Sequence, residues 1–135
     1  MKRKMHVLIV DDEKRLVNNL QAILKRRGFE TTGVTSGEDA LEVLAQAENV
    51  DVILLDVKME GMNGIDVLRE VKKRFGTVQV ILYTGHATIQ QGIEGLELGA
   101  FYYVQKPSPI EELVDLIQSA CDRRIREHGD EVRLA

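Results

Sequence analysis

Five side chains that can bind a metal ion or a phosphate follow four short apolar runs of the sequence. Asp11 and Asp12 follow the run Val-Leu-Ile-Val, and Asp56 follows Val-Ile-Leu-Leu. Thr84 and Lys106 follow the next two runs. In an open parallel sheet, ligands bind outside the carboxyl ends of the strands. If the runs are strands of one such sheet, three carboxylates, a hydroxyl and an amine converge at one edge.

These side-chain types fit the transfer of a phosphoryl group to a carboxylate. Crowded carboxylates repel one another unless a cation or protons intervene, and Mg²⁺ prefers carboxylate oxygens while it keeps several waters. A carboxylate can also act as a nucleophile and form an acyl phosphate. The transferred group needs positive charge, which Mg²⁺ and Lys106 can supply, and the Thr84 hydroxyl can donate a hydrogen bond to it.

The elements that must position these groups are visible as short runs rich in β-branched and aromatic residues. Three of the runs are continuously apolar, which is typical of parallel strands covered on both faces. The second run is more polar and is expected near an edge of the sheet. The predicted strands are Val7–Val10, Thr31–Val34, Val52–Leu55, Val78–Tyr83 and Phe101–Gln105.

Residues at helical spacing fill the segments between these runs. Gly28 is expected just past the end of the first helix, and Ser36 is expected to cap the second. The third helix follows Asn63. The last helix is expected to begin at Ser108–Pro109, with the serine as its cap and the proline in the first helical position.

The fourth helix is predicted to follow Thr88, and its apolar residues recur every three or four positions. That spacing predicts an inner face made of Ile89, Ile93 and Leu96.

Five successive β-α units predict a single α/β domain with a parallel sheet and helices on both of its faces. Two strand orders satisfy that count, and the flavodoxin-like order 2-1-3-4-5 is the commoner for five strands. We expect a doubly wound (βα)5 domain over residues 1–122. Residues 123–135 are expected to form a charged extension of the last helix that frays at Gly129.

Composition excludes several classes of protein. The chain has 135 residues, the size of one domain, and 44% hydrophobic and 30% charged residues are typical of a soluble globular protein. A net charge of −4 argues against direct binding of nucleic acid. The single cysteine, Cys121, rules out an internal disulfide. No run approaches the ~18 apolar residues of a membrane span, and the run after the basic start is too short for a signal peptide. We therefore expect a cytoplasmic protein.

The chain resembles the receiver domain of bacterial two-component response regulators, from residue 6 to about residue 120. A single matching fragment would be weak evidence, but several in the same order with strands between them are specific. The matching fragments are Val10-Asp11-Asp12-Glu13, Leu54-Leu55-Asp56-Val57-Lys58-Met59, Gly61-Met62-Asn63-Gly64, Thr84-Gly85-His86, Gly99-Ala100, and Tyr103 through Lys106-Pro107.

This resemblance implies that Asp56 accepts a phosphoryl group from a phosphohistidine of a sensor histidine kinase or a phosphotransfer protein. Asp11, Asp12 and Asp56 would hold Mg²⁺, or Mn²⁺, together with the backbone carbonyl of Lys58. Thr84 and Lys106 would contact the phosphoryl oxygens. The chain would then be a phospho-accepting signalling domain that catalyses only its own phosphorylation and dephosphorylation.

The resemblance also implies how the signal is passed on. Tyr103 would turn inward as Thr84 moves, and the Lys106–Pro107 peptide bond would be cis. The face built from the fourth helix, the fifth strand and the fifth helix would contact a downstream protein, a missing output domain or a second copy of the chain. Ala135 ends either a stand-alone regulator or a receiver cut from a longer chain.

One residue departs from the family pattern. Most members have proline between the positions of Met59 and Gly61, and this chain has Glu60. We expect the loss of a fixed φ angle to loosen the loop after Asp56. The side chains of Lys58 and His86 lie two positions after Asp56 and Thr84, where each could reach the site or simply face solvent.

The same residues could instead have purely structural roles. Asp11 and Asp12 could cap the first helix, Thr84 could end its strand, Lys106 could be a solvated charge, and Tyr103 could be packing. His6 and His128 have no partner pattern, and Cys121 is expected to be packed rather than reactive.

Two other functions compete with phosphoryl acceptance. An aspartyl phosphatase usually carries a second acid two residues after its nucleophile, where this chain has Lys58. A nucleotide- or flavin-binding domain on the same fold would need a glycine-rich first turn, and here that turn carries two acids.

Overall fold

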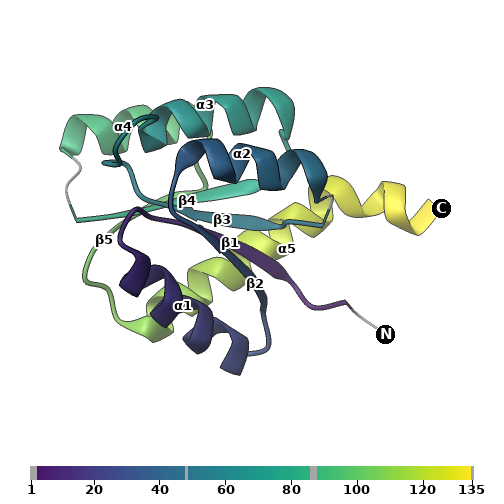
Figure 1. The fold of residues 1–135 in the computed structure, drawn as a ribbon. Coiled ribbons are helices and arrows are strands. Elements are labelled where there is room, and N and C mark those ends of the chain that lie inside the picture. Colours follow the sequence, from purple (N-terminus) through teal and green to yellow (C-terminus); the bar gives the residue numbers. More distant parts are fainter. Residues whose placement is uncertain (1–2, 48, 86–87, 135) are drawn as a thin grey trace.

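A parallel five-stranded sheet forms the middle layer of the protein in a computed structural model that describes residues 3–47, 49–85 and 88–134 (Figure 1). The strand order is β2-β1-β3-β4-β5, and every neighbouring pair is parallel. This is the flavodoxin-like order predicted from the sequence. The strands are β1 (His6–Val10), β2 (Glu30–Val34), β3 (Val52–Leu55), β4 (Gln79–Thr84) and β5 (Tyr102–Gln105).

Helices cover both faces of the sheet. Figure 1 shows α2, α3 and α4 on one face and α1 and α5 on the other. The helices are α1 (Lys14–Arg26), α2 (Gly37–Gln46), α3 (Gly64–Arg74), α4 (Ile89–Glu97) and α5 (Ile110–Leu134).

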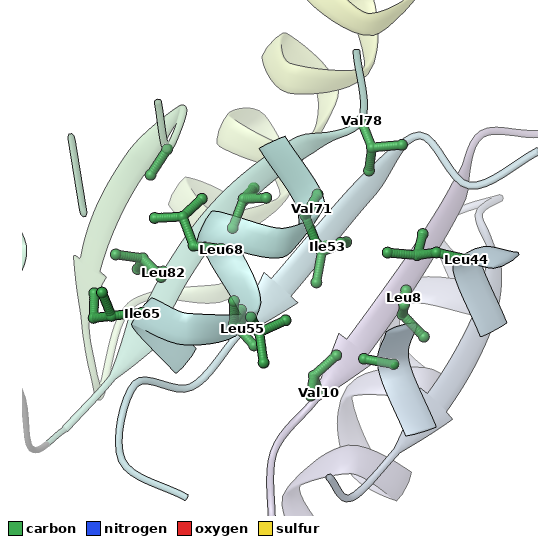
Figure 2. Close-up of a cluster of buried hydrophobic side chains, with 14 of the residues drawn as sticks. Leu8, Val10, Leu44, Ile53, Leu55, Ile65, Leu68, Val71, Val78 and Leu82 are labelled. Atoms are coloured by element: carbon green, nitrogen blue, oxygen red, sulfur yellow. The ribbon is translucent and has the colours of Figure 1, made fainter. Parts of the chain in front are cut away.

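The continuously apolar strands are explained by burial on both faces. Along β1, Leu8 and Val10 pack into the cluster under α2 and α3, which Figure 2 shows, whereas Val7 and Ile9 pack into the cluster under α1 and α5. Side chains alternate between faces along a strand, so each strand that is covered on both sides needs apolar residues at every position. The edge strand β2 is only partly buried, in agreement with its polar sequence.

Local signals set most helix ends as predicted. The hydroxyl of Ser36 accepts a hydrogen bond from the Asp39 amide at 3.1 Å, and the Asn63 side chain accepts one from the Asp66 amide at 3.0 Å. Thr88 forms a reciprocal capping box at the start of α4. Gly28 follows α1 with a φ angle of 93°, which is a conformation that favours glycine.

The inner face predicted for α4 is wrong. Ile89, Ile93 and Leu96 are 85%, 47% and 47% exposed, and the residues that α4 buries are Gly92 and Gly95. A Cβ atom on Gly95 would lie 2.3 Å from Leu82 Cδ1. The helix therefore approaches the sheet through its glycines, and its large apolar side chains point away.

Two predictions about the last helix are also wrong. Its first residue is Ile110, and the Ser108 hydroxyl lies 3.5 Å from the Pro109 carbonyl oxygen instead of accepting an amide hydrogen bond. The helix does not end near Gly129 but continues to Leu134. In Figure 1 this end of α5 extends past the sheet. No helix within the described residues is long and apolar enough to cross a membrane.

Candidate functional site

The carboxyl ends of β1, β3 and β4 bring the predicted carboxylates and hydroxyl together. Asp11 follows β1 directly, Asp56 follows β3 directly, and Thr84 is the last residue of β4. Asp11, Asp56 and Thr84 are 3%, 5% and 0% exposed. In contrast, Asp12 is exposed at the mouth of the site. One carboxylate oxygen from each of Asp11, Asp12 and Asp56 can be chosen so that all lie within 4.8 Å of one another.

Lys106 reaches this cluster from the segment after β5. Its ammonium nitrogen donates a hydrogen bond to Asp11 Oδ2 at 2.5 Å and lies 3.9 Å from Asp56 Oδ2. The same nitrogen lies 5.4 Å from the centre of the buried Tyr83 ring. An aromatic face attracts a cation at this separation, so Tyr83 helps hold Lys106 over the carboxylates. The Lys106–Pro107 peptide bond is cis.

Asp11 has a local structural role in addition to its place in the cluster. Its Oδ1 accepts a hydrogen bond from the Glu13 amide at 2.9 Å, while its Oδ2 faces Lys106. Both oxygens therefore have partners. The turn before α1 thus fixes the orientation of this carboxylate.

Asp56 is held differently. Its Oδ1 is buried and has no hydrogen-bond partner among the residues that the structure describes. Burial raises the pKa of the Asp56 carboxyl; the Thr84 hydroxyl and the Lys106 ammonium oppose this rise, and Asp11 and Asp12 add to it. The pKa therefore lies above its ordinary value, because burial and two nearby carboxylates disfavour the ionised form.

The three carboxylates fit a hard divalent cation. An oxygen that is buried without a partner is costly, and a cation would satisfy it and relieve the repulsion within the cluster. Oxygen donors of this type are those that Mg²⁺ binds. The residues present can therefore hold the metal ion that the sequence predicts.

A cleft of about 710 Å³ opens above this cluster. The exposed side chains of Lys58 and Glu60 line it, and Glu13 and Gly85 contribute to its rim. Lys58 can therefore approach a group bound at Asp56. His86 lies outside the described residues.

Two contributions to the site were not assigned from the sequence. The sequence places Tyr83 at the end of its strand beside Thr84 but does not predict that its ring contacts the Lys106 ammonium group. Gly64, at the start of α3, donates its amide hydrogen to the Val57 carbonyl at 2.8 Å, and a Cβ atom there would lie 2.1 Å from the Asp56 carbonyl oxygen. A glycine is required for this approach. The available evidence in the sequence was that Gly64 stands eight residues after Asp56, in the fragment Gly61-Met62-Asn63-Gly64 that matches the family.

Tyr103 lies on β5 next to α4. It is partly buried, and a Cβ atom on Gly92 would lie 3.4 Å from its ring. Ile89, Ile93 and Leu96 are exposed on α4, and Tyr102 is exposed on the edge strand β5, where it pairs with Ile81 on the face of the sheet opposite α4. We refer to these four exposed side chains at the β5 edge of the sheet as the α4–β5 apolar face.

The two remaining histidines that the structure describes, and Cys121, lie outside the carboxylate cluster. The imidazole of His6 is buried between Thr32 Oγ1, at 2.7 Å, and Asn49 Oδ1, at 3.3 Å. Cys121 is fully buried, and burial raises the pKa of its thiol to about 12. Cys121 is therefore packed, as predicted. His128, near the end of α5, is partly buried.

Comparisons with known proteins agree with this site. Residues 7–118 match the response regulator receiver domain family. The sensory transduction protein RegX3 of Mycobacterium tuberculosis is 40% identical over 117 residues, which are 87% of this chain and 51% of that protein. The transcriptional regulatory protein YkoG of Bacillus subtilis is 36% identical over 126 residues, which are 93% of this chain and 53% of that protein.

Solved structures show the same fold. A response regulator receiver domain from Clostridium thermocellum aligns with a TM-score of 0.85 and 31% identity, covering 89% of this chain and 96% of that one. A CheY-like receiver domain from Methanospirillum hungatei aligns with a TM-score of 0.87 and 26% identity, covering 93% and 99%.

The chain belongs to the response regulator receiver domain family. It spans between a quarter and about half of the length of the curated relatives that it matches.

Proposed function

We propose that this receiver domain accepts a phosphoryl group on Asp56 from a phosphohistidine of a sensor histidine kinase or a phosphotransfer protein. The observation that carries the proposal is the buried Asp56 carboxylate, which has one oxygen without a hydrogen-bond partner among the described residues and faces an open cleft. The carboxylate therefore has room for further partners, a metal ion at one oxygen and a phosphoryl group at the other.

In the proposed reaction a carboxylate oxygen of Asp56 attacks the phosphorus atom, and a new P–O bond forms as the P–N bond of the phosphohistidine breaks. The electron pair of the broken bond stays on the imidazole nitrogen of the donor. The product is an acyl phosphate on Asp56. No oxidant or further reactant is needed.

The residues around Asp56 would stabilise the transferred group. Asp11, Asp12 and Asp56, with the backbone carbonyl of Lys58, would hold Mg²⁺ or Mn²⁺, and that cation would neutralise charge on the phosphoryl oxygens. Lys106 already lies 3.9 Å from Asp56 and would pair with another of these oxygens. Thr84 would donate its hydroxyl hydrogen to the third.

Movement of Thr84 would change the room available to Tyr103 and so reshape the α4–β5 apolar face, together with the adjoining start of α5. Because that face exposes large apolar side chains, we propose it as the surface that meets a downstream protein, an output domain or a second copy of the chain. The domain would be a signalling switch whose chemistry acts only on itself.

The test is to treat the protein with acetyl phosphate and Mg²⁺ and to measure its intact mass. We expect one added phosphoryl group that survives acid, is lost in base, and maps to Asp56. The Asp56→Asn variant should remain unlabelled, whereas Asp115→Asn, the same change at an exposed position of α5, should label normally. A label that persists in Asp56→Asn would exclude Asp56 as the acceptor.

A further inference from the structure

A second concave site lies at the opposite end of the sheet from Asp56. Its volume is about 760 Å³. Four segments line it: the residues before β1, the turn between α1 and β2, Asp51 just before β3, and the half of α5 that begins at Gln118. Figure 1 shows the start of β1 and this half of α5 on the same side of the molecule. We refer to this site as the basic groove.

The lining of the basic groove is strongly cationic, although the chain as a whole carries a net charge of −4. Its acidic lining residues are Asp51 and Asp122, and His128 also contributes. The arginine and lysine residues that line it are Arg3, Lys4, Arg27, Arg124 and Arg126.

Ion pairs within the protein neutralise only part of this charge. Arg3 donates two hydrogen bonds of 2.8 Å to the buried Asp51, and Arg27 is paired with Glu111 outside the groove. Lys4 and Arg126 are exposed, and neither makes an ion pair with the side chains that the structure describes, which do not include those of residues 129–134. The groove therefore keeps positive charge that an anion could neutralise.

The groove also has apolar walls. Phe29, from the turn after α1, is 6% exposed, and Ile125 on α5 is 36% exposed. Met5 contributes a third, partly buried apolar side chain. Concave sites of several hundred Å³ that combine apolar walls with a few charged groups are typical of small-molecule binding sites.

We propose that the basic groove binds a small organic anion that carries phosphate groups and has the size of a nucleoside diphosphate. Lys4 and Arg126 bind the phosphate oxygens, since guanidinium and ammonium groups are the usual partners of phosphate. The flat part of the ligand lies against Met5, Phe29 and Ile125. A ligand held in this way bridges the N-terminal segment and α5.

The experiment uses ADP, inorganic pyrophosphate and adenosine as probes, with binding measured by calorimetry and by amide chemical shifts. The protein carries Asp56→Asn, and EDTA is present, so that the acidic site at the other end of the sheet is silent. We expect ADP to bind more tightly than pyrophosphate and adenosine to bind weakly or not at all. The shifted amides should be those of Phe29 and Ile125.

Charge-reversal variants provide the matched comparison. Lys4→Glu and Arg126→Glu should each weaken ADP binding about tenfold or more, an effect of the size of one charge-assisted contact. Lys73→Glu makes the same change in net charge at an exposed residue of α3 outside the groove and should leave binding unchanged.

Three results would overturn the proposal. Equal weakening in Lys73→Glu would show diffuse attraction, and shifts confined to the residues around Asp11 would place the anion at the other site. Binding of a poly-aspartate peptide without binding of ADP or pyrophosphate would assign the groove to an acidic protein partner. Acetyl phosphate should label Lys4→Glu and Arg126→Glu normally, so this test and that of the proposed function fail independently.

Discussion

Replacing Asp56 by asparagine should stabilise the metal-free protein, because the ionised carboxylate is an unfavourable group in the fold. Asparagine has almost the same shape and removes the negative charge. Asp56 is 5% exposed and shares its cluster with Asp11 and Asp12. Loss of its charge removes the cost of burying a carboxylate and the repulsion from Asp11 and Asp12, but it also weakens the interactions with Thr84 and Lys106.

The size of the effect follows from the distances. At an effective dielectric constant of about 20, unit charges 4.8 Å apart repel by about 3.5 kcal/mol, and charges 3.9 Å apart attract by about 4 kcal/mol. Burial adds to the repulsion and the hydrogen bond from Thr84 adds to the attraction, so the net gain of the asparagine variant should be on the order of 1–3 kcal/mol. For a domain of this size the melting temperature should rise by about 3–10 °C.

The effect should depend on pH in one direction. Since the pKa of Asp56 is raised in the folded protein, the folded state holds this proton more tightly than the unfolded state does. Below the unfolded-state pKa, Asp56 is protonated in both states and costs nothing. Stability is lost as the pH rises to and through the folded-state pKa. The advantage of Asp56→Asn should therefore be larger at neutral pH than in acid, where it should vanish.

The assay is urea unfolding followed by circular dichroism, in EDTA, at neutral pH and at about pH 3, below the ordinary aspartate value. Asp115→Asn is the control and should change the free energy of unfolding by less than about 0.5 kcal/mol. Mg²⁺ should stabilise the unmodified protein more than it stabilises Asp56→Asn. A variant that is less stable at neutral pH, or equally stabilised in acid, would refute the electrostatic account of this site.

Three further changes test the surroundings of the site. Gly95→Ala should lower the free energy of unfolding by about 1–3 kcal/mol, since the new Cβ atom would overlap Leu82. Gly92→Ala, one turn earlier, should lower it by less. Denaturant titration of both variants compares the two losses. Ile89→Gln should change the free energy of unfolding by less than about 0.5 kcal/mol because Ile89 is exposed. A larger loss would show that Ile89 is buried, as hydrophobic periodicity predicts. Glu60→Pro should reduce the mobility of the loop after Asp56 in ¹⁵N relaxation; unchanged mobility would contradict the role given to the missing proline.

The strands, and the meeting of the site residues at one edge of the sheet, could be predicted from the sequence. Strands that are buried on both faces appear in it as continuous runs of apolar residues. Runs such as Val7–Val10 and Val52–Leu55 have no polar position, and each predicted strand differs from the observed one by at most one residue at either end. Once the strand ends are known, parallel topology places whatever follows them at one edge. Asp11, Asp56 and Thr84 lie together for that reason.

The orientation of α4 could not be obtained from hydrophobic periodicity. Periodicity assumes that the largest apolar side chains face the core, and for α4 that rule selects Ile89, Ile93 and Leu96. The helix instead packs through Gly92 and Gly95, because only a residue without a Cβ atom allows its backbone so close to Leu82. A glycine pair three residues apart was the available signal, and a hydropathy pattern gives it almost no weight.

The buried charges at the other end of the sheet were missed for a different reason. Arg124 is 4% exposed, and its Nε lies 3.8 Å from Asp51 Oδ1. In the sequence it stands in a charged stretch, which predicts only a charged extension of the last helix. Its spacing of seven residues from Ile117 does continue the buried stripe of α5. Charge patterning alone cannot show that a buried acidic partner, Asp51, lies just before β3.

The two buried aspartates that flank β3 differ in the hydrogen-bond partners that the fold supplies to them. Asp51, just before the strand, accepts two hydrogen bonds from Arg3 and one from the His6 amide. Its oxygens are occupied, so its charge serves to bind the N-terminal segment and α5 to the sheet. Asp56, just after the strand, is nearly as buried, yet one of its oxygens has no hydrogen-bond partner among the described residues, and two other carboxylates lie beside it. Burial alone does not distinguish Asp51 from Asp56, but the number of hydrogen-bond donors around each carboxylate does. A carboxylate that is short of partners and opens into a cleft can gain further stabilisation from a ligand, and the fold places Asp56 at the edge where parallel sheets bind their ligands.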